Sequence, residues 1–166
     1  MWIKRTLADE LRKLTASFPV VALVGPRQVG KTSLLEHDFP EFRYVSLDTA
    51  SQAEMAETRP AEFLQRFPPP VIIDEVQYAP ALFRHIKAYV DAHRNERGLF
   101  LLTGSQNYAL MQEISDSLAG RAAVIPFLGL SGAEWLASPA AKDGTWGRFW
   151  LRGGYPGLWS DAGVSR

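Results

Sequence analysis

The stretch that decides the fold is Gly25-Pro-Arg-Gln-Val-Gly-Lys-Thr32. It fits the pattern glycine, four residues, glycine, lysine, then serine or threonine, which is typical of a phosphate-binding loop, the Walker A motif. An apolar run at residues 20–24 comes directly before it, and a segment with helical content, residues 32–37, forms its far side. Such a loop needs this context, because backbone N–H groups and the start of a helix must converge on phosphate oxygens.

The residue types in this stretch predict a separate role for the glycines, the lysine and the threonine. Glycines at both ends permit the sharp turn of the chain. Lys31 supplies a positive charge for the β and γ phosphates, and the hydroxyl of Thr32 is placed to bind Mg²⁺. The predicted nucleotide-binding residues are Gly25, Pro26, Arg27, Gln28, Val29, Gly30, Lys31, Thr32 and Ser33. The alternative is a glycine-bearing turn from a strand to a helix, with an exposed lysine and no ligand.

A pair of carboxylates follows a second apolar run, in the sequence Val71-Ile-Ile-Asp-Glu75. This has the form of a Walker B segment, in which a buried strand delivers an aspartate beside the phosphate loop. Asp74 is the predicted magnesium ligand, and Glu75 is the predicted base that polarises the attacking water. Alone, the same pair could instead cap a helix or end a strand in solvent, but the Walker A motif upstream favours the nucleotide site.

A third apolar run ends in hydroxyls and amides, in the sequence Phe100-Leu-Leu-Thr-Gly-Ser-Gln-Asn107. If this strand ends next to the phosphate loop, Thr103 or Ser105 can sense the γ phosphate. A polar turn that caps the next helix, through Ser105 or Asn107, explains the same residues. Both interpretations stay open.

The remaining chain alternates between apolar runs and segments with helical content. Weaker strands are predicted at residues 42–47 and 122–127, and the third run spans residues 99–102; helical segments are predicted at residues 50–67, 81–93 and 108–118. Runs that do not alternate with polar residues suit strands buried on both faces. The order therefore predicts an α/β fold, with a parallel sheet between helices and a ligand site at the carboxyl ends of the strands.

The two ends of the chain have weaker patterns. Ile3, Leu7, Leu11 and Leu14 recur at helical spacing and predict an amphipathic entry helix with its charged residues facing solvent. After Phe127 the pattern loosens, and only residues 131–136 suggest a further helix. We expect an ATP-binding domain at residues 1–128 and, at residues 129–166, the start of a helical lid region that continues in a longer chain.

Composition excludes several classes of protein. With 166 residues and 46% hydrophobic content, the chain can form one domain with a real core. Basic and acidic residues each number 18, so nothing in the balance favours nucleic acid, and the absence of cysteine excludes disulfides and thiolate metal sites. Residues 18–24 are too few to span a bilayer. These features predict a soluble, cytoplasmic protein without a membrane partner.

Six motifs in order carry a resemblance to a known family: the amphipathic start, the phosphate loop, Ile73-Asp-Glu-Val-Gln77, Leu101-Leu-Thr-Gly-Ser105, Ser117-Leu-Ala-Gly-Arg121 and Gly153-Gly-Tyr-Pro156. Together they resemble the AAA superfamily, and more closely the bacterial and archaeal ATP-binding proteins that carry an AAA domain followed by a carboxyl-terminal domain of unknown function. The resemblance implies a P-loop NTPase fold, a three-layer α/β/α sandwich around a central, mainly parallel five-stranded sheet.

The resemblance also implies ATP and Mg²⁺ as cofactors and magnesium-dependent ATP hydrolysis that drives a conformational switch. Two alternatives are a regulatory nucleotide-binding module with negligible turnover and a DNA-associated ATPase whose DNA-binding region lies outside this chain. Arg121 stands at a junction where AAA proteins often present an arginine to a neighbouring subunit of a homo-oligomer. A surface arginine that binds the last-turn carbonyls of a helix is the alternative.

Overall fold

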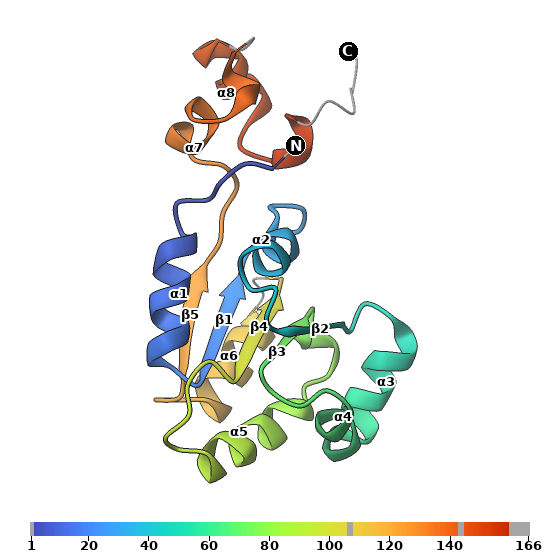
Figure 1. Ribbon diagram of the computed structural model, residues 1–166. Coiled ribbons are helices and arrows are strands. Elements are labelled where there is room, and N and C mark those ends of the chain that lie inside the picture. Colours follow the sequence, from blue (N-terminus) through green and yellow to red (C-terminus); the bar gives the residue numbers. More distant parts are fainter. Residues whose placement is uncertain (1, 106–107, 143–144, 160–166) are drawn as a thin grey trace.

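The computed structural model describes residues 2–105, 108–142 and 145–159. Within these ranges a five-stranded sheet forms in the order β2-β3-β4-β1-β5, and each neighbouring pair is parallel (Figure 1). The strands are β1 (Val20–Val24), β2 (Arg43–Ser46), β3 (Val71–Asp74), β4 (Phe100–Gly104) and β5 (Ala122–Pro126). All five predicted strands are therefore present, and the predicted α/β fold with a parallel sheet is confirmed.

Helices cover both faces of the sheet. Helices α1 (Ala8–Ser17) and α2 (Lys31–Asp38) share one buried cluster with Val21 and Leu23 of β1. On the opposite face, Val20, Ala22 and Val24 share a larger cluster with α3 (Ala50–Thr58), α4 (Pro60–Arg66), α5 (Leu82–Ala92) and α6 (Tyr108–Ser117). Successive residues of a strand point to opposite faces, so β1 is apolar throughout because it has no solvent face. The sandwich has three layers.

The entry helix begins later than the sequence predicts. Helix α1 starts at Ala8, while residues 2–5 have no regular structure and run toward the carboxyl-terminal part of the chain (Figure 1). Ile3 is buried in a different cluster from α1, with Leu130 and Trp135. Arg5, expected on the solvent face of the helix, is only 6% exposed. The expectation of one helix from Ile3 was wrong, because Ile3 and Arg5 find partners that lie far from them in sequence.

The helical segment predicted at residues 50–67 forms two helices. Helix α3 ends at Thr58 and α4 begins with Pro60. Proline has no N–H to donate to the preceding turn and its ring clashes there, so it begins a new helix rather than continuing the old one. A buried Phe63 in α4 and a buried Ala56 in α3 hold both helices on the same cluster.

A small helical unit lies beyond the carboxyl edge of the sheet (Figure 1). It comprises α7 (Gly132–Leu136), the 3-10 helix Pro139–Ala141, α8 (Trp146–Arg152) and the 3-10 helix Pro156–Leu158. Trp135 and Trp159 form its buried centre, with Phe149 packed against them. Helix α8 was not predicted, because aromatic contacts rather than a periodic pattern hold it in place. Residues 143–144 and 160–166 of the predicted lid region lie outside the described ranges, and the division at residue 128 stays a prediction.

Candidate nucleotide-binding site

The phosphate loop connects β1 to α2 at the carboxyl edge of the sheet. Gly25 must be glycine, because a Cβ there would lie 1.9 Å from the carbonyl oxygen of Phe127. Gln28 and Gly30 adopt left-handed φ angles of 63° and 93°, which turn the chain back into the helix. The sequence predicted this turn from its glycines, but the left-handed Gln28 is a finding of the structure.

Lys31 lies inside the loop. Its ammonium donates to the carbonyl oxygens of Gly25 and Pro26, both at 2.8 Å, and the residue is only 5% exposed. Burial lowers the pKa of Lys31, an effect that the carboxylates of Glu75 and Asp74 partly oppose. The loop therefore holds a positive charge at its centre, in a place where water stabilises that charge poorly.

Asp74 ends β3 and accepts hydrogen bonds from three hydroxyl groups. Thr32 Oγ1 lies 3.0 Å from Asp74 Oδ2 and 3.1 Å from Oδ1, and the hydroxyl of Tyr44 donates to Oδ2 at 2.9 Å. Thr103 donates to Oδ1. Burial and the bond to Asp74 raise the pKa of Tyr44, so its hydroxyl stays a donor. Carboxylate and hydroxyl oxygens this close together are the ligand types that Mg²⁺ prefers, and the site fits that ion.

Glu75 follows at the end of β3 with a left-handed φ of 56°. Its backbone N–H donates to Thr103 Oγ1 at 3.2 Å, and its carboxylate accepts a hydrogen bond from the amide of Gln77. A left-handed glutamate is unusual, because the side chain crowds the backbone there. The Glu75 carboxylate lies within electrostatic range of Lys31.

The two candidate phosphate sensors differ in their hydrogen-bond partners. Thr103, at the end of β4, bridges Asp74 and the backbone of Glu75. The hydroxyl of Ser105 is buried and has no hydrogen-bond partner among the described residues. Asn107, the alternative helix cap, lies outside the described ranges. The sensor role of either residue stays a prediction.

Arg121 lies at the opposite edge of the sheet. It directly precedes β5, and its guanidinium binds the carboxylate of Asp91 with bonds of 2.8 and 3.1 Å. Its third contact is with the carbonyl of Ala119 at 3.0 Å. The structure thus does not bring Arg121 to the phosphate loop of its own chain. Its predicted action on a neighbouring subunit stays a prediction.

Two other loop residues have different partners from those of Lys31. Arg27 donates to the hydroxyl of Tyr78 at 2.9 Å near the surface, and Val29 packs its side chain into the core. Beside the loop lies a pocket of about 140 Å³, lined by the amino-terminal segment (Trp2, Ile3, Arg5), the loop and α2 (Val29, Gly30, Ser33) and the carboxyl-terminal unit (Leu130, Pro156). Trp2 stacks on His37 of α2 with ring centres 4.0 Å apart.

Three residues in and around the site were not predicted. Tyr44 reaches Asp74 from β2, and Gln77 reaches Glu75 from the 3-10 helix Val76–Tyr78. Arg5 reaches the loop from the amino-terminal segment. Gln77 belongs to one of the motifs that carry the family resemblance, which was a usable signal. Arg5 belongs to the amphipathic start, another of these motifs, but its spacing indicated the solvent face of a helix. Tyr44 lacked any such signal, because only the fold brings it close to Asp74.

Comparisons with known proteins agree with the geometry. A family model described as an AAA domain matches residues 17–136. Two curated relatives, the uncharacterized proteins Mb2031c of Mycobacterium bovis and Rv2008c of Mycobacterium tuberculosis, are each 34% identical over 156 residues. The match covers 92% of this chain and 33% of each relative, so the chain spans about a third of their length.

A solved structure has the same fold. The Walker-type ATPase PABY2304 of Pyrococcus abyssi superimposes with a TM-score of 0.67 at 17% identity, covering 95% of this chain and 65% of that one. Together with the family match, this likeness confirms the P-loop fold and the resemblance to the AAA superfamily. None of the helices in the described ranges combines the length and apolar composition needed to cross a bilayer.

Proposed function

Because the chain belongs to the AAA domain family, we propose that it binds ATP together with Mg²⁺ and hydrolyses it. One observation carries the proposal: Thr32, next to the loop lysine, hydrogen-bonds the strand-end carboxylate of Asp74 at 3.0 Å. Two residues that lie 42 positions apart in sequence thus present oxygen ligands beside a phosphate loop. A glycine turn without a ligand would not require that pairing.

The phosphate groups would occupy the loop. Lys31 would exchange its bonds with the carbonyls of Gly25 and Pro26 for bonds with β and γ phosphate oxygens. Thr32 and Asp74 would hold Mg²⁺, which supplies positive charge to the same oxygens when bound. Burial makes the exchange favourable, because a desolvated ammonium interacts strongly with an anion.

We propose that the pocket beside the loop, with a volume of about 140 Å³, takes the base of the nucleotide rather than the whole nucleoside. Its lining is more apolar than polar and includes Trp2, together with Ser33, one residue after Thr32. A planar base fits such a site, since stacking and apolar contact contribute most of its binding energy. The preference for adenine over guanine rests on the family, and the sequence has no Asn-Lys-x-Asp motif of the kind that reads guanine.

Glu75 would act as the base for hydrolysis. Its carboxylate would take a proton from water as the water oxygen forms a bond to the γ phosphorus, and the bond from that phosphorus to the β,γ-bridging oxygen would break. ADP and inorganic phosphate are the products. General bases of this kind contribute roughly 10² to 10⁴ in rate.

Glu75→Gln tests the proposal, because it keeps size and hydrogen bonding but removes the base. We expect this variant to bind ATP and Mg²⁺ like the parent in a calorimetric titration and to release phosphate at least about 100 times more slowly. Hydrolysis at the parental rate would place the base elsewhere. Failure of the parent chain to bind ATP at all would refute the whole assignment.

The bond from Gln77 to Glu75 favours a second candidate function, a nucleotide-binding module that turns over very slowly. One carboxylate oxygen of Glu75 is engaged by the amide of Gln77 rather than open to water. Phosphate release by the parent chain, compared with that of Gln77→Leu, separates the two functions. A slow parent that Gln77→Leu accelerates would indicate a restrained module, whereas an active parent that Gln77→Leu slows would indicate a working ATPase.

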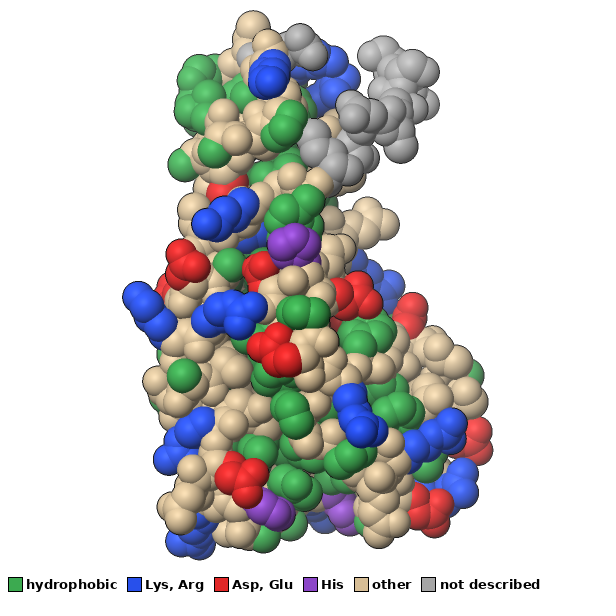
Figure 2. Space-filling view, viewed as in Figure 1, with side chains coloured by type: hydrophobic (Ala, Val, Ile, Leu, Met, Phe, Trp, Pro, Cys, Tyr) green, Lys and Arg blue, Asp and Glu red, His purple; other side chains and the backbone are tan. Residues whose placement is uncertain are grey.

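The proposal also covers nucleic acid and other copies of this chain as partners. Lys and Arg side chains are interspersed with Asp and Glu over the face in Figure 2, so that face has no large patch of one charge for a nucleic-acid backbone. We propose that any contact with nucleic acid uses a region outside these 166 residues. We further propose that hydrolysis drives a conformational switch and that the chain assembles into a homo-oligomer.

A further inference from the structure

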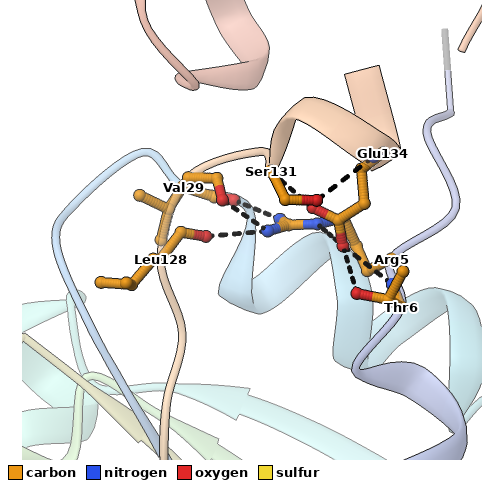
Figure 3. Close-up of polar contacts among 7 residues, drawn as sticks. Arg5, Thr6, Val29, Leu128, Ser131 and Glu134 are labelled. Atoms are coloured by element: carbon orange, nitrogen blue, oxygen red, sulfur yellow. Dashed lines mark hydrogen bonds and ion pairs between the residues drawn. The ribbon is translucent and has the colours of Figure 1, made fainter. Parts of the chain in front are cut away.

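The amino-terminal segment passes between the phosphate loop and the carboxyl-terminal unit. Arg5 is the charged residue at its centre, and Figure 3 shows its guanidinium pointing at backbone carbonyls on one side and at Glu134 on the other. Both charged side chains are buried, at 7% and 4% exposure. Arg5 also lines the pocket proposed for the base, but the proposed hydrolysis does not use its ion pair with Glu134, although the pair touches the loop.

The guanidinium binds three carbonyl oxygens. Nη1 donates to Val29 of the phosphate loop at 2.9 Å, and Nη2 donates to Leu128 at 2.8 Å and to Gly129 at 3.1 Å. Its carbon lies 4.0 Å from the ring centre of Phe127, over the ring. A planar fork can hold several acceptors at once, which a single ammonium cannot. Arg5 therefore fixes the loop relative to the chain that leaves β5.

The bond to Val29 has a geometric consequence for the loop. A trans peptide is planar, and its C=O and N–H groups point in opposite directions. With the Val29 carbonyl directed at Arg5, the N–H of Gly30 is directed away from Arg5. Gly30 has a left-handed φ of 93°, and such a glycine can rotate its peptide easily unless something restrains it. The bond to Arg5 is that restraint.

Glu134 holds Arg5 in place from the other side. Its Oε1 lies 3.2 Å from Arg5 Nε and accepts from the backbone N–H of Thr6 at 2.8 Å. Its Oε2 accepts from the backbone N–H of Ser131 at 2.8 Å, as part of the cap of α7. Burial acts to raise the pKa of Glu134, but these bonds and the charge of Arg5 outweigh burial, and the pKa is lowered. The carboxylate stays charged and compensates the buried arginine.

We propose that Arg5, held by Glu134, is a positioning residue that orients the Val29–Gly30 peptide so that the Gly30 N–H faces bound phosphate. This inference rests on the proposed nucleotide function. Arg5 acts from outside the loop, through the backbone, and contacts no reacting atom. The loop and the carboxyl-terminal unit are thereby joined through one side chain.

The test compares Arg5→Met and Arg5→Lys with the matched control Arg12→Met. Arg12 resembles Arg5 in kind, because it pairs with Glu41 at 3.5 Å and lies over the ring of Phe39 at 4.7 Å, but its pair is about half exposed. Affinities for ADP and for inorganic pyrophosphate are measured with Mg²⁺, by competition with a fluorescent nucleotide, at a temperature where circular dichroism shows every variant folded. Pyrophosphate has no base, so it reports the loop without the adjacent pocket.

We expect both Arg5 variants to bind ADP and pyrophosphate about tenfold more weakly than the parent, by the same factor for each ligand. Arg5→Lys keeps the positive charge, so a loss of affinity in this variant would show that the planar guanidinium, with its several donors, is required. Arg12→Met should bind like the parent. If the Arg5 variants do not fold, Glu134→Gln decides instead, with a smaller loss of about threefold expected for both ligands.

Three results would overturn the inference. Unchanged affinities with a lowered Tm would make Arg5 purely structural. A loss for ADP without a loss for pyrophosphate would place its effect in the pocket rather than in the loop. Full affinity in Arg5→Lys would mean that Arg5 acts through its positive charge alone and not through the geometry of its guanidinium. Absence of nucleotide binding by the parent is a separate outcome, and it refutes the proposed function rather than the role of Arg5.

Discussion

Charged side chains are buried at one edge of the parallel sheet and partly exposed at the other. At the carboxyl edge, Lys31 and Asp74 are 5% and 6% exposed and have polar partners within the fold. At the amino edge, Arg121 and Asp91 form a pair whose side chains are 31% and 33% exposed. Arg94 and Arg97 line an open hollow beside that pair and donate to backbone carbonyls.

This difference indicates where the fold accepts a cost in stability for the sake of function. Burying a charge costs free energy unless its partners compensate for it, so a buried charged cluster persists only where something requires it. Solvated charges cost little and contribute little. Substitutions at the two edges should therefore differ strongly in effect, and the following predictions run from the largest effect to the smallest.

Lys31→Ala should weaken ATP binding by at least about 100-fold, because it removes the charge at the centre of the loop. The fold should survive, since burial lowers the pKa of Lys31 and the charged form gains little from the folded state. Calorimetric titration with ATP and Mg²⁺, alongside circular dichroism, measures both. Unchanged affinity in a folded variant would remove the phosphate-loop assignment.

Glu134→Gln should lower the unfolding free energy by about 2 kcal/mol at pH 7, because it leaves Arg5 without its compensating charge. The folded-state pKa of Glu134 lies below its ordinary value. Its contribution is thus complete above the unfolded-state pKa of about 4.3 and is lost as the pH falls through the folded-state pKa. Denaturant titrations at pH 7, 5 and 3 should show the gap between parent and variant closing. A gap that is constant with pH would mean that the charge of Glu134 does not stabilise the fold.

Tyr44→Phe should raise the Mg²⁺ concentration needed for half-saturation of ATP binding by about threefold, because Asp74 loses the donor that fixes one carboxylate oxygen. Nucleotide affinity without Mg²⁺ should stay unchanged. Tyr78→Phe is the matched control, since Tyr78 is 41% exposed against 39% for Tyr44 but binds Arg27 instead of Asp74. Equal Mg²⁺ shifts in both variants would show that the hydroxyl of Tyr44 has no specific role.

Arg121→Ala should have the smallest effect within one subunit. The pair with Asp91 is solvated, so Tm should change by no more than about 2 °C and monomeric ATP binding should stay normal. If Arg121 acts on a neighbouring subunit, hydrolysis should rise with protein concentration in the parent but not in the variant. Rates that are independent of concentration and equal in both would refute that action.

Much of the sheet and its carboxyl edge could be predicted from sequence. Apolar runs without alternation identify strands buried on both faces, and parallel strands place Gly25, Asp74 and Thr103 at one edge. That placement puts Asp74 beside the phosphate loop, and the hydrogen bond between Thr32 and Asp74 is a finding of the structure. The strands and their placement depend on local sequence pattern and on the right-handedness of crossover connections. Both can be inferred from the sequence.

Contacts made by single side chains across the fold could not be predicted. Arg5 has the spacing of a solvent-facing helical residue, yet its partners are Val29, Leu128 and Glu134. Helix α8 has no periodic pattern, since it is held by Trp135 and Trp159 rather than by a long apolar stripe. The partners of Arg5 lie at least 24 residues away, beyond the window in which periodicity can be read. The partners of α8 lie nearer in sequence but outside the helix, so they leave no apolar stripe along it.

The tight approach of Gly25 to Phe127 changes how mutants of the loop should be interpreted in a genetic screen. Any side chain at Gly25 would overlap the Phe127 carbonyl, whose position β5 fixes, so loss of function there reports a steric conflict before it reports anything about phosphate. Gly30 differs, because a Cβ there would meet nothing closer than 3.9 Å and only its left-handed backbone resists substitution. Two glycines of one motif are thus intolerant for unrelated reasons, and suppressors of one should not rescue the other.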